Sequence, residues 1–152
     1  ADALNYSKLG EAWARPFITL IPYSGQMKWV AVLGGGFAGV DGASAGFGRY
    51  VYIIDLEPNV LHGDKTGTVL KAVELEALDP EVSDIPNGVV APISALSVDS
   101  ASTLDLYGNI IYLADLQGKT WKLDLAKASI TGPDSELFNV ETHLNSEATL
   151  DN

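Results

Sequence analysis

The chain has 152 residues, of which 47% are hydrophobic, so it is long enough for one domain with a core and too apolar to be disordered along its whole length. Its 20 acidic and 9 basic side chains give a net charge of -11, and the lack of a basic cluster argues against nucleic-acid binding. The absence of cysteine excludes disulfides, thiol nucleophiles and Cys-based zinc sites, and no apolar run approaches the roughly 18 residues of a membrane helix.

The predicted elements are short β-strands. Residues 1–12 form a polar leading segment, and Trp13–Pro16 turns the chain into the first strand, because proline biases its predecessor toward extended geometry. β-branched and aromatic residues between turn signals then predict nine strands. These are Phe17–Ile21, Lys28–Leu33, Tyr50–Leu56, Thr68–Leu75, Val89–Ala91, Ala95–Val98, one strand on each side of Asp115–Gly118, and Phe138–Thr142. The pattern predicts an all-β fold.

Two glycine-rich or acidic stretches separate these strands. Gly34–Gly48 contains seven glycines and is predicted to be a loop. Glu76–Gly88 is acidic and contains proline, and it is predicted to be a second loop with a short helical turn at Ala77–Asp79. Residues 133–152 form a tail that is unassigned apart from the last predicted strand.

The segment Asn109–Leu125 is the most informative part of the chain. It predicts a strand, a tight turn at Asp115–Gly118 and a second strand that carries Trp121. An earlier segment, Gly48–Leu56, ends in the same way, with an aspartate after a strand. Repeated units of this kind suggest a propeller. We expect Asp115 and Asp124 to cap turns.

The three tryptophans of the chain each lie in or beside a predicted strand. Trp13, Trp29 and Trp121 are therefore predicted to pack within the sheets. The loop His62–Gly67 is predicted to be a hairpin turn rather than an ion site.

A nucleotide-binding pattern is also present. Gly34, Gly36 and Gly39 follow a strand with the spacing G-x-G-x-x-G, and Asp55 or Glu57 ends the next strand, where a ribose-binding acid would stand. A dinucleotide-binding (FAD or NAD) oxidoreductase fragment that uses Gly34–Gly39 is thus an alternative hypothesis. The fingerprint needs a helix that begins at the last glycine, and the further glycines after Gly39 each cost a helix about 1 kcal/mol.

Four stretches together resemble the C-terminal β-propeller of the PilY1 family, the tip-associated proteins of type IV pili. They are Leu9–Pro16, Trp29–Phe37, Gly48–Asp55, and Asn87–Leu125, the last of which resembles the family's Tyr-x-Gly-Asp-x-x-Gly-x-x-Trp-x-x-Asp signature. The resemblance implies that residues 1–152 form one propeller-like segment of about two or three blades. A blade takes about 40–50 residues and a propeller needs about four or more blades, so we expect a fragment of a larger ring.

The resemblance also implies a calcium loop before the signature. The matching stretch here offers Asp99, Ser102, Thr103, Asp105 and Asn109, and Asp99, Thr103, Asp105 and Asn109 are the candidate metal ligands. Calcium prefers six to eight oxygen ligands, which alternating acidic and amide side chains supply. Ala101 and Leu104 interrupt the spacing, and Gly108 lies too late for the sharp turn, so an ordinary loop remains the alternative.

The expected function is non-catalytic. His62 and His143 are the only histidines, and neither lies beside a nucleophile motif such as G-x-S-x-G. The resemblance implies a surface protein, extracellular or periplasmic in transit, that acts in pilus assembly or adhesion with pilus or cell-envelope proteins, or with a host or surface ligand. A propeller blade of a quinone-cofactor dehydrogenase is a third hypothesis, because those blades also carry Trp-bearing repeats that end in Asp.

Overall fold

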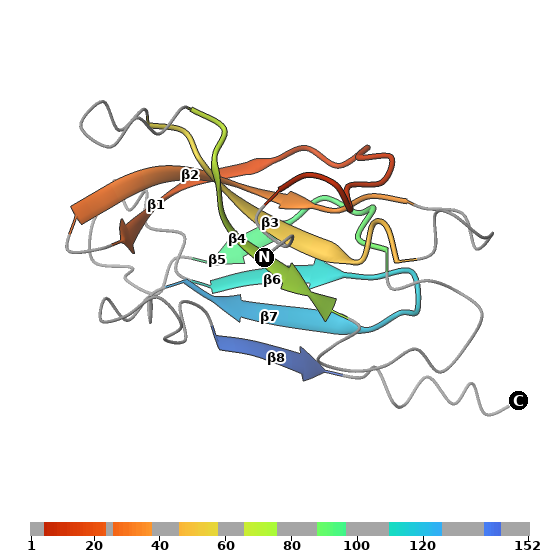
Figure 1. Cartoon of the computed structure of the whole chain (residues 1–152). Helices are drawn as coiled ribbons and strands as arrows, with labels where there is room; N and C mark the ends of the chain where they lie inside the picture. Colours follow the sequence, from red (N-terminus) through yellow and green to blue (C-terminus); the bar gives the residue numbers. More distant parts are fainter. Residues whose placement is uncertain are drawn as a thin grey trace, which may run out of the picture.

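Two antiparallel sheets make up the structure. The computed structural model describes residues 5–23, 26–37, 46–57, 66–75, 88–96 and 110–125, together with the backbone of 139–143. Its strands are β1 (Phe17–Tyr23), β2 (Gln26–Gly34), β3 (Tyr50–Asp55), β4 (Val69–Glu74), β5 (Ser94–Leu96), β6 (Ile110–Ala114), β7 (Thr120–Asp124) and β8 (Asn139–His143). The first sheet has the order β1-β2-β3-β4 and the second β5-β6-β7-β8 (Figure 1). The predicted all-β class is confirmed, and within the described residues neither sheet closes on itself.

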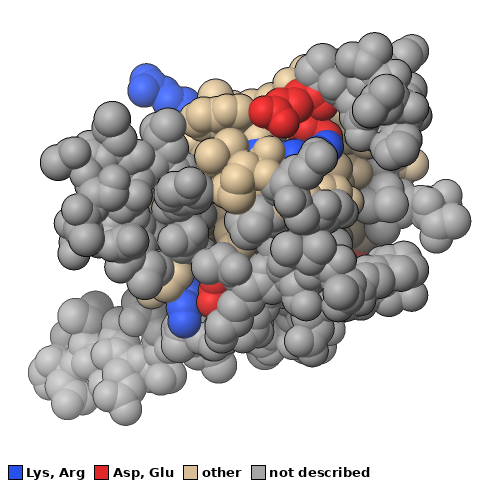
Figure 2. Space-filling view, turned by 90° about the vertical axis from the view of Figure 1, so that its left-hand side faces the viewer, with Lys and Arg blue, Asp and Glu red and all other residues tan. Residues whose placement is uncertain are grey.

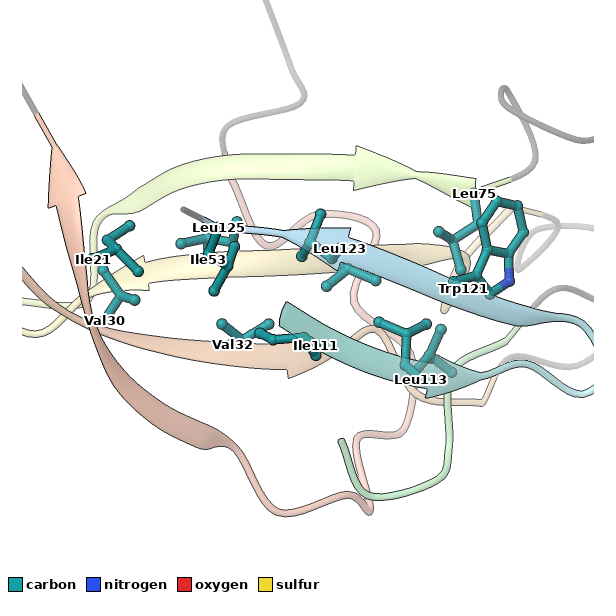
Figure 3. Packing of buried hydrophobic residues seen from close by; sticks show 12 residues of the cluster. Ile21, Val30, Val32, Ile53, Leu75, Ile111, Leu113, Trp121, Leu123 and Leu125 are labelled. Carbon is teal, nitrogen blue, oxygen red and sulfur yellow. The ribbon is translucent and has the colours of Figure 1, made fainter. Parts of the chain in front are cut away.

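The core lies between the two sheets. Alternate residues of a strand point to opposite faces, so each strand that borders the core contributes every second side chain. Figure 3 shows these side chains pointing toward one another from both sheets. The buried cluster comprises Ile21, Val30, Val32, Val51, Ile53, Leu75, Val89, Ile111, Leu113, Trp121, Leu123 and Leu125. Burying one such side chain stabilises the fold by about 1.5–3 kcal/mol.

The predicted strand at Val89–Ala91 is wrong, because this segment pairs with no strand. Its backbone groups bond instead to glycines near the ends of β2 and β3: the Val89 N–H donates to the Gly48 carbonyl, and the Val89 carbonyl accepts from the Gly36 N–H. The Val89 side chain is fully buried in the core. The Val89 side chain therefore fills space between the two sheets, and its backbone does not take part in strand pairing.

Other predicted boundaries shift by a few residues. The weak strand expected at Ala95–Val98 is β5, and the last predicted strand is β8. Gly34 closes β2 instead of opening a loop, and Phe37 forms an isolated bridge with Glu11 of the leading segment. The predicted turn at residues 77–79 and most of the tail after residue 132 lie outside the described residues.

The three tryptophans do not share one role. Trp121 is completely buried, as predicted, and Trp29 is half-buried. The prediction for Trp13 is wrong, because its side chain is 79% exposed. It stands in an extended segment before β1, where the neighbouring Ala14 turns inward and is buried, so the indole points to solvent.

The two sheets repeat the same strand order and a similar central register. Tyr52 in β3 pairs with Leu33 in β2, and Trp121 in β7 pairs with Leu113 in β6. Three residues after each aromatic residue the strand ends in an aspartate, Asp55 or Asp124. The third strand of one sheet thus corresponds to the third strand of the other.

Candidate functional site

The predicted metal ligands cannot be placed. Asp99, Thr103, Asp105 and Asn109 all lie in residues 97–109, outside the described residues. Within the part of the chain that the structure describes, no group of three or more acidic or histidine side chains comes together as a metal site. The calcium site thus remains a prediction.

Asp115 organises the turn between β6 and β7. Its Oδ1 accepts hydrogen bonds from the backbone N–H groups of Gln117 and Lys119, each at 2.9 Å. Its Oδ2 accepts from Nε1 of Trp121, also at 2.9 Å. Gly118 takes a φ of 81° and donates its N–H to the Asp115 carbonyl, a conformation that favours glycine.

These contacts make Asp115 a structural residue, as the sequence predicted. The side chain is buried, with 7% of its surface exposed, and three N–H donors use both carboxylate oxygens. A buried carboxylate is costly unless it is bonded in this way. The same contacts hold the Trp121 indole in the core.

Asp55 builds a related turn after β3. Its Oδ1 accepts from the Glu57 N–H at 2.9 Å, and its Oδ2 forms an ion pair with Lys28 Nζ. The Gly67 N–H donates to the Asp55 carbonyl, and Gly67 has a φ of 94°. Where Asp115 uses a neutral indole donor from its own hairpin, Asp55 uses a cation that stands 27 residues earlier in the chain.

The ion pair of Lys28 is a contact that the sequence analysis missed. The Lys28 side chain is 13% exposed, and Nζ also lies 5.5 Å from the centre of the Tyr23 ring. The signal available in the sequence was a single lysine opening an otherwise apolar strand. Only the antiparallel register brings that strand beside Asp55.

Gly36 of the nucleotide-binding pattern and its neighbour Gly35 are engaged by the backbone, whereas Gly39 lies outside the described residues. The Gly35 N–H donates to the Tyr50 carbonyl and the Gly36 N–H to the Val89 carbonyl. A Cβ added to Gly36 would also collide with the backbone of Glu11. The strand that ends at Asp55 runs antiparallel to β2, whereas the dinucleotide fold uses parallel strands. This geometry does not favour a phosphate cradle at these glycines.

Three tyrosines gather on the side of the first sheet away from the core. The Tyr52 ring centre lies 5.8 Å from that of Tyr6 and 6.0 Å from that of Tyr50. Tyr6 also donates a hydrogen bond from its hydroxyl to the Gly67 carbonyl. Together with the ring contact to Tyr52, this bond holds the leading segment against β3. The signal for this cluster was the alternation Tyr50-Val-Tyr52, which puts both rings on one face.

The Tyr52 hydroxyl is fully buried and has no hydrogen-bond partner among the described residues. Burial raises the pKa of Tyr52 to about 12, and the neighbouring Tyr50 and Tyr6 add to the effect. The side chain thus stays neutral through the physiological range. A neutral, unpartnered phenol offers no general base, so this cluster serves packing.

On the side shown in Figure 2, the described acidic and basic side chains stand in a few small groups. Within the described residues, no helix is long and apolar enough to cross a membrane.

In comparisons with known proteins, no family model, curated protein or solved structure matches the chain.

Proposed function

We propose that the chain is a non-catalytic segment of a bacterial surface protein, similar to the propeller of the PilY1 family, that acts in type IV pilus assembly or adhesion. The hairpin β6–β7 is the observation that carries this proposal. Its signature residues Asp115, Gly118 and Trp121 each make a contact that closes the same turn. A sequence signature whose members interlock in space is stronger support than a match of residue types alone.

The proposed architecture is two neighbouring blades of a larger propeller. Support comes from two four-stranded antiparallel sheets that pack face to face through one shared core. Propeller blades are four-stranded sheets of this kind, and rings typically have four or more of them. The sheets would act as a rigid frame on which loops present the binding residues.

Exposed aromatic residues suit such a binding role. Trp13 and Phe37 are 79% and 43% exposed, and the backbone bridge between Glu11 and Phe37 holds their two segments side by side. Exposed large aromatic side chains are enriched at sites of protein recognition. They are the described residues that we expect to contact a pilus or surface partner.

The pilus proposal is tested by binding of the immobilised chain to type IV pili sheared from a piliated bacterium. We expect saturable binding that weakens when Trp13 is replaced by alanine. Trp13 is exposed, so Trp13→Ala leaves the fold intact, and circular dichroism checks this. Absence of binding, with and without calcium, would contradict the proposal.

Calcium would stiffen the loop before β6 through Asp99, Thr103, Asp105 and Asn109. Isothermal titration with calcium tests this part separately. We expect heat from the parent chain, none from Asp105→Ala, and unchanged heat from Asp64→Ala, whose carboxylate lies in the predicted hairpin turn. A parent chain that gives only the heat of dilution removes the metal from the proposal.

A further inference from the structure

Part of the leading segment lies against the first sheet, and we call residues 5–12 the strap. Its side chains are exposed apart from that of Leu9, which is half-buried. A segment that buries so little apolar surface gains little from the hydrophobic effect. The position of the strap on the sheet therefore depends on a small set of specific contacts.

One end of the strap is held by its backbone. The Gly10 N–H donates to the Gly35 carbonyl at 2.8 Å, and Glu11 and Phe37 exchange two backbone hydrogen bonds of 2.7 and 3.0 Å. A Cβ on Gly10 would lie 2.3 Å from the Phe37 carbonyl oxygen, so the two backbones approach too closely for a larger residue at this position. This end of the strap is thus fitted to the residues that follow β2.

The other end of the strap is held by Tyr6. Its hydroxyl donates to the Gly67 carbonyl, and its ring centre lies 5.8 Å from that of Tyr52. Between the two ends, the Gly48 N–H donates to the Lys8 carbonyl at 2.9 Å. The strap is therefore bonded to the rest of the molecule at both ends and in the middle.

The strap covers a tyrosine of the first sheet. Tyr52 has no exposed surface, and its hydroxyl has no hydrogen-bond partner among the described residues. Lifting Tyr6 away would therefore break no hydrogen bond of Tyr52 and would give its hydroxyl access to water. The contacts that close the strap are thus its own backbone bonds and those of Tyr6.

We propose that the strap opens away from the first sheet as one unit while both sheets stay folded, and that it controls access to the aromatic face of Tyr50 and Tyr52. Elements with few buried apolar contacts and exposed backbone hydrogen bonds open locally, at a lower free energy than the core. The strap has these properties, whereas the tyrosines beneath it belong to a paired strand. A partner that binds the uncovered face shifts the strap toward the open form. The proposal does not depend on the pilus role.

Native-state hydrogen exchange of the full chain, followed by NMR, tests the proposal. The amides of Glu11, Phe37 and Gly48 are bonded across the strap, and we call them the strap reporters. The amides of Gly35 and Gly36 donate to carbonyls outside the strap and are the sheet reporters. We expect the strap reporters to share one opening constant and to exchange at least about tenfold faster than the sheet reporters, after correction for intrinsic rates.

Variants at the two ends test whether the strap moves as a unit. Gly10→Ala collides with the facing backbone at one end, and Tyr6→Ala removes the ring contact and the hydrogen bond at the other. Either variant is expected to raise the opening constant of all strap reporters about tenfold and to leave the sheet reporters unchanged. Ser7→Ala, at an exposed position between the two ends, is the matched control and should change neither set.

Three results would overturn the proposal. Strap reporters that exchange as slowly as the sheet reporters would show that the strap does not open by itself. An effect of each variant on the nearest reporter alone would show fraying of one end, and equal acceleration of the sheet reporters would show unfolding of the sheets. Tyr6→Phe guards against misfolding of the alanine variants, because it keeps the ring and removes only the bond to Gly67. It should give a smaller increase at the same strap reporters, and no increase would count against the proposal.

Discussion

The two sheets have the same strand order but different polarity. In β6 and β7 of the second sheet, buried and less buried residues alternate strictly, as in a sheet with one face in the core and one in water. In β3 of the first sheet, three consecutive residues, Val51, Tyr52 and Ile53, are all buried. The additional buried residue is Tyr52, which lies on the side of the sheet away from the core, next to Tyr6 of the leading segment.

The turns of the two sheets differ in a similar way. Asp115 is satisfied within its own hairpin, by backbone groups and the Trp121 indole. Asp55 takes its charged partner, Lys28, from a different strand. The second sheet thus carries a locally complete unit, whereas the first depends on contacts between distant parts of the chain. Six substitutions, arranged in four tests, probe these differences, from the largest expected effect to the smallest.

Trp121→Ala should lower the free energy of unfolding by about 3–5 kcal/mol, because it empties the largest fully buried site of the core. It also removes one donor from Asp115. Urea denaturation measures the loss. The exposed Trp13→Ala is the control and should change stability by less than about 0.5 kcal/mol. Similar losses for both variants would contradict the assigned burial.

Asp115→Ala should cost about 3 kcal/mol, because it leaves three N–H donors without an acceptor, two of them in buried contacts. Asp55→Ala should cost about 1–2 kcal/mol, since it orphans one backbone N–H and a lysine that still reaches solvent. Thermal or urea unfolding of the two variants shows which turn contributes more to the free energy of unfolding. The reverse order would mean that the ion pair of the first sheet, and not the hairpin of the second, is the stronger element.

Gly36→Ala and Gly118→Ala share a positive φ but differ in the space around them. A Cβ on Gly118 meets no atom within 4 Å, so this variant should lose only about 1–2 kcal/mol for the left-handed backbone. A Cβ on Gly36 collides with the Glu11 backbone, so this variant should lose more and detach the leading segment. Hydrogen exchange at the Phe37 amide, which donates to Glu11, reports that detachment. Unchanged protection there would refute the contact.

Tyr52→Phe should be nearly neutral at pH 7, because the hydroxyl that it removes has no partner among the described residues. The pKa of Tyr52 is raised from 10.0 to about 12 in the folded chain, so the unfolded chain releases this proton first. The contribution of Tyr52 to the free energy of unfolding is therefore fully present below pH 10 and is lost as the pH rises toward 12. The variant should flatten that fall in alkaline unfolding curves. An unaltered curve would show that Tyr52 is not the group responsible.

Local patterns predicted the hairpin of β6 and β7 in more detail than any other part of the two sheets. The turn at Asp115–Gly118, the cap role of Asp115 and the burial of Trp121 all follow from residues within one hairpin. Short-range chemistry of this kind is readable because the interacting groups are neighbours in the chain. The candidate calcium ligands lie outside the described residues, so that prediction stays open.

The errors occurred where distant segments meet. Val89 is a β-branched residue of the kind that favours strands, but its side chain is buried between the sheets. Its backbone bonds to glycines near the ends of β2 and β3. Trp13 is a large aromatic residue of the kind usually found in a core, but in the segment before β1 its side chain points outward. The apolar character of a side chain indicates that it favours burial. It does not indicate which surface of the protein will bury it.

The sequence by itself determined the all-β class, eight of the nine predicted strands and the closed hairpin around Asp115, because strand periodicity and turn chemistry act over a few residues. Only the tertiary structure decided that Lys28 partners Asp55, that Tyr6 covers Tyr52, and that Val89 is buried between the sheets. These features depend on strand order and register, which arise when segments far apart in the chain bury a common core.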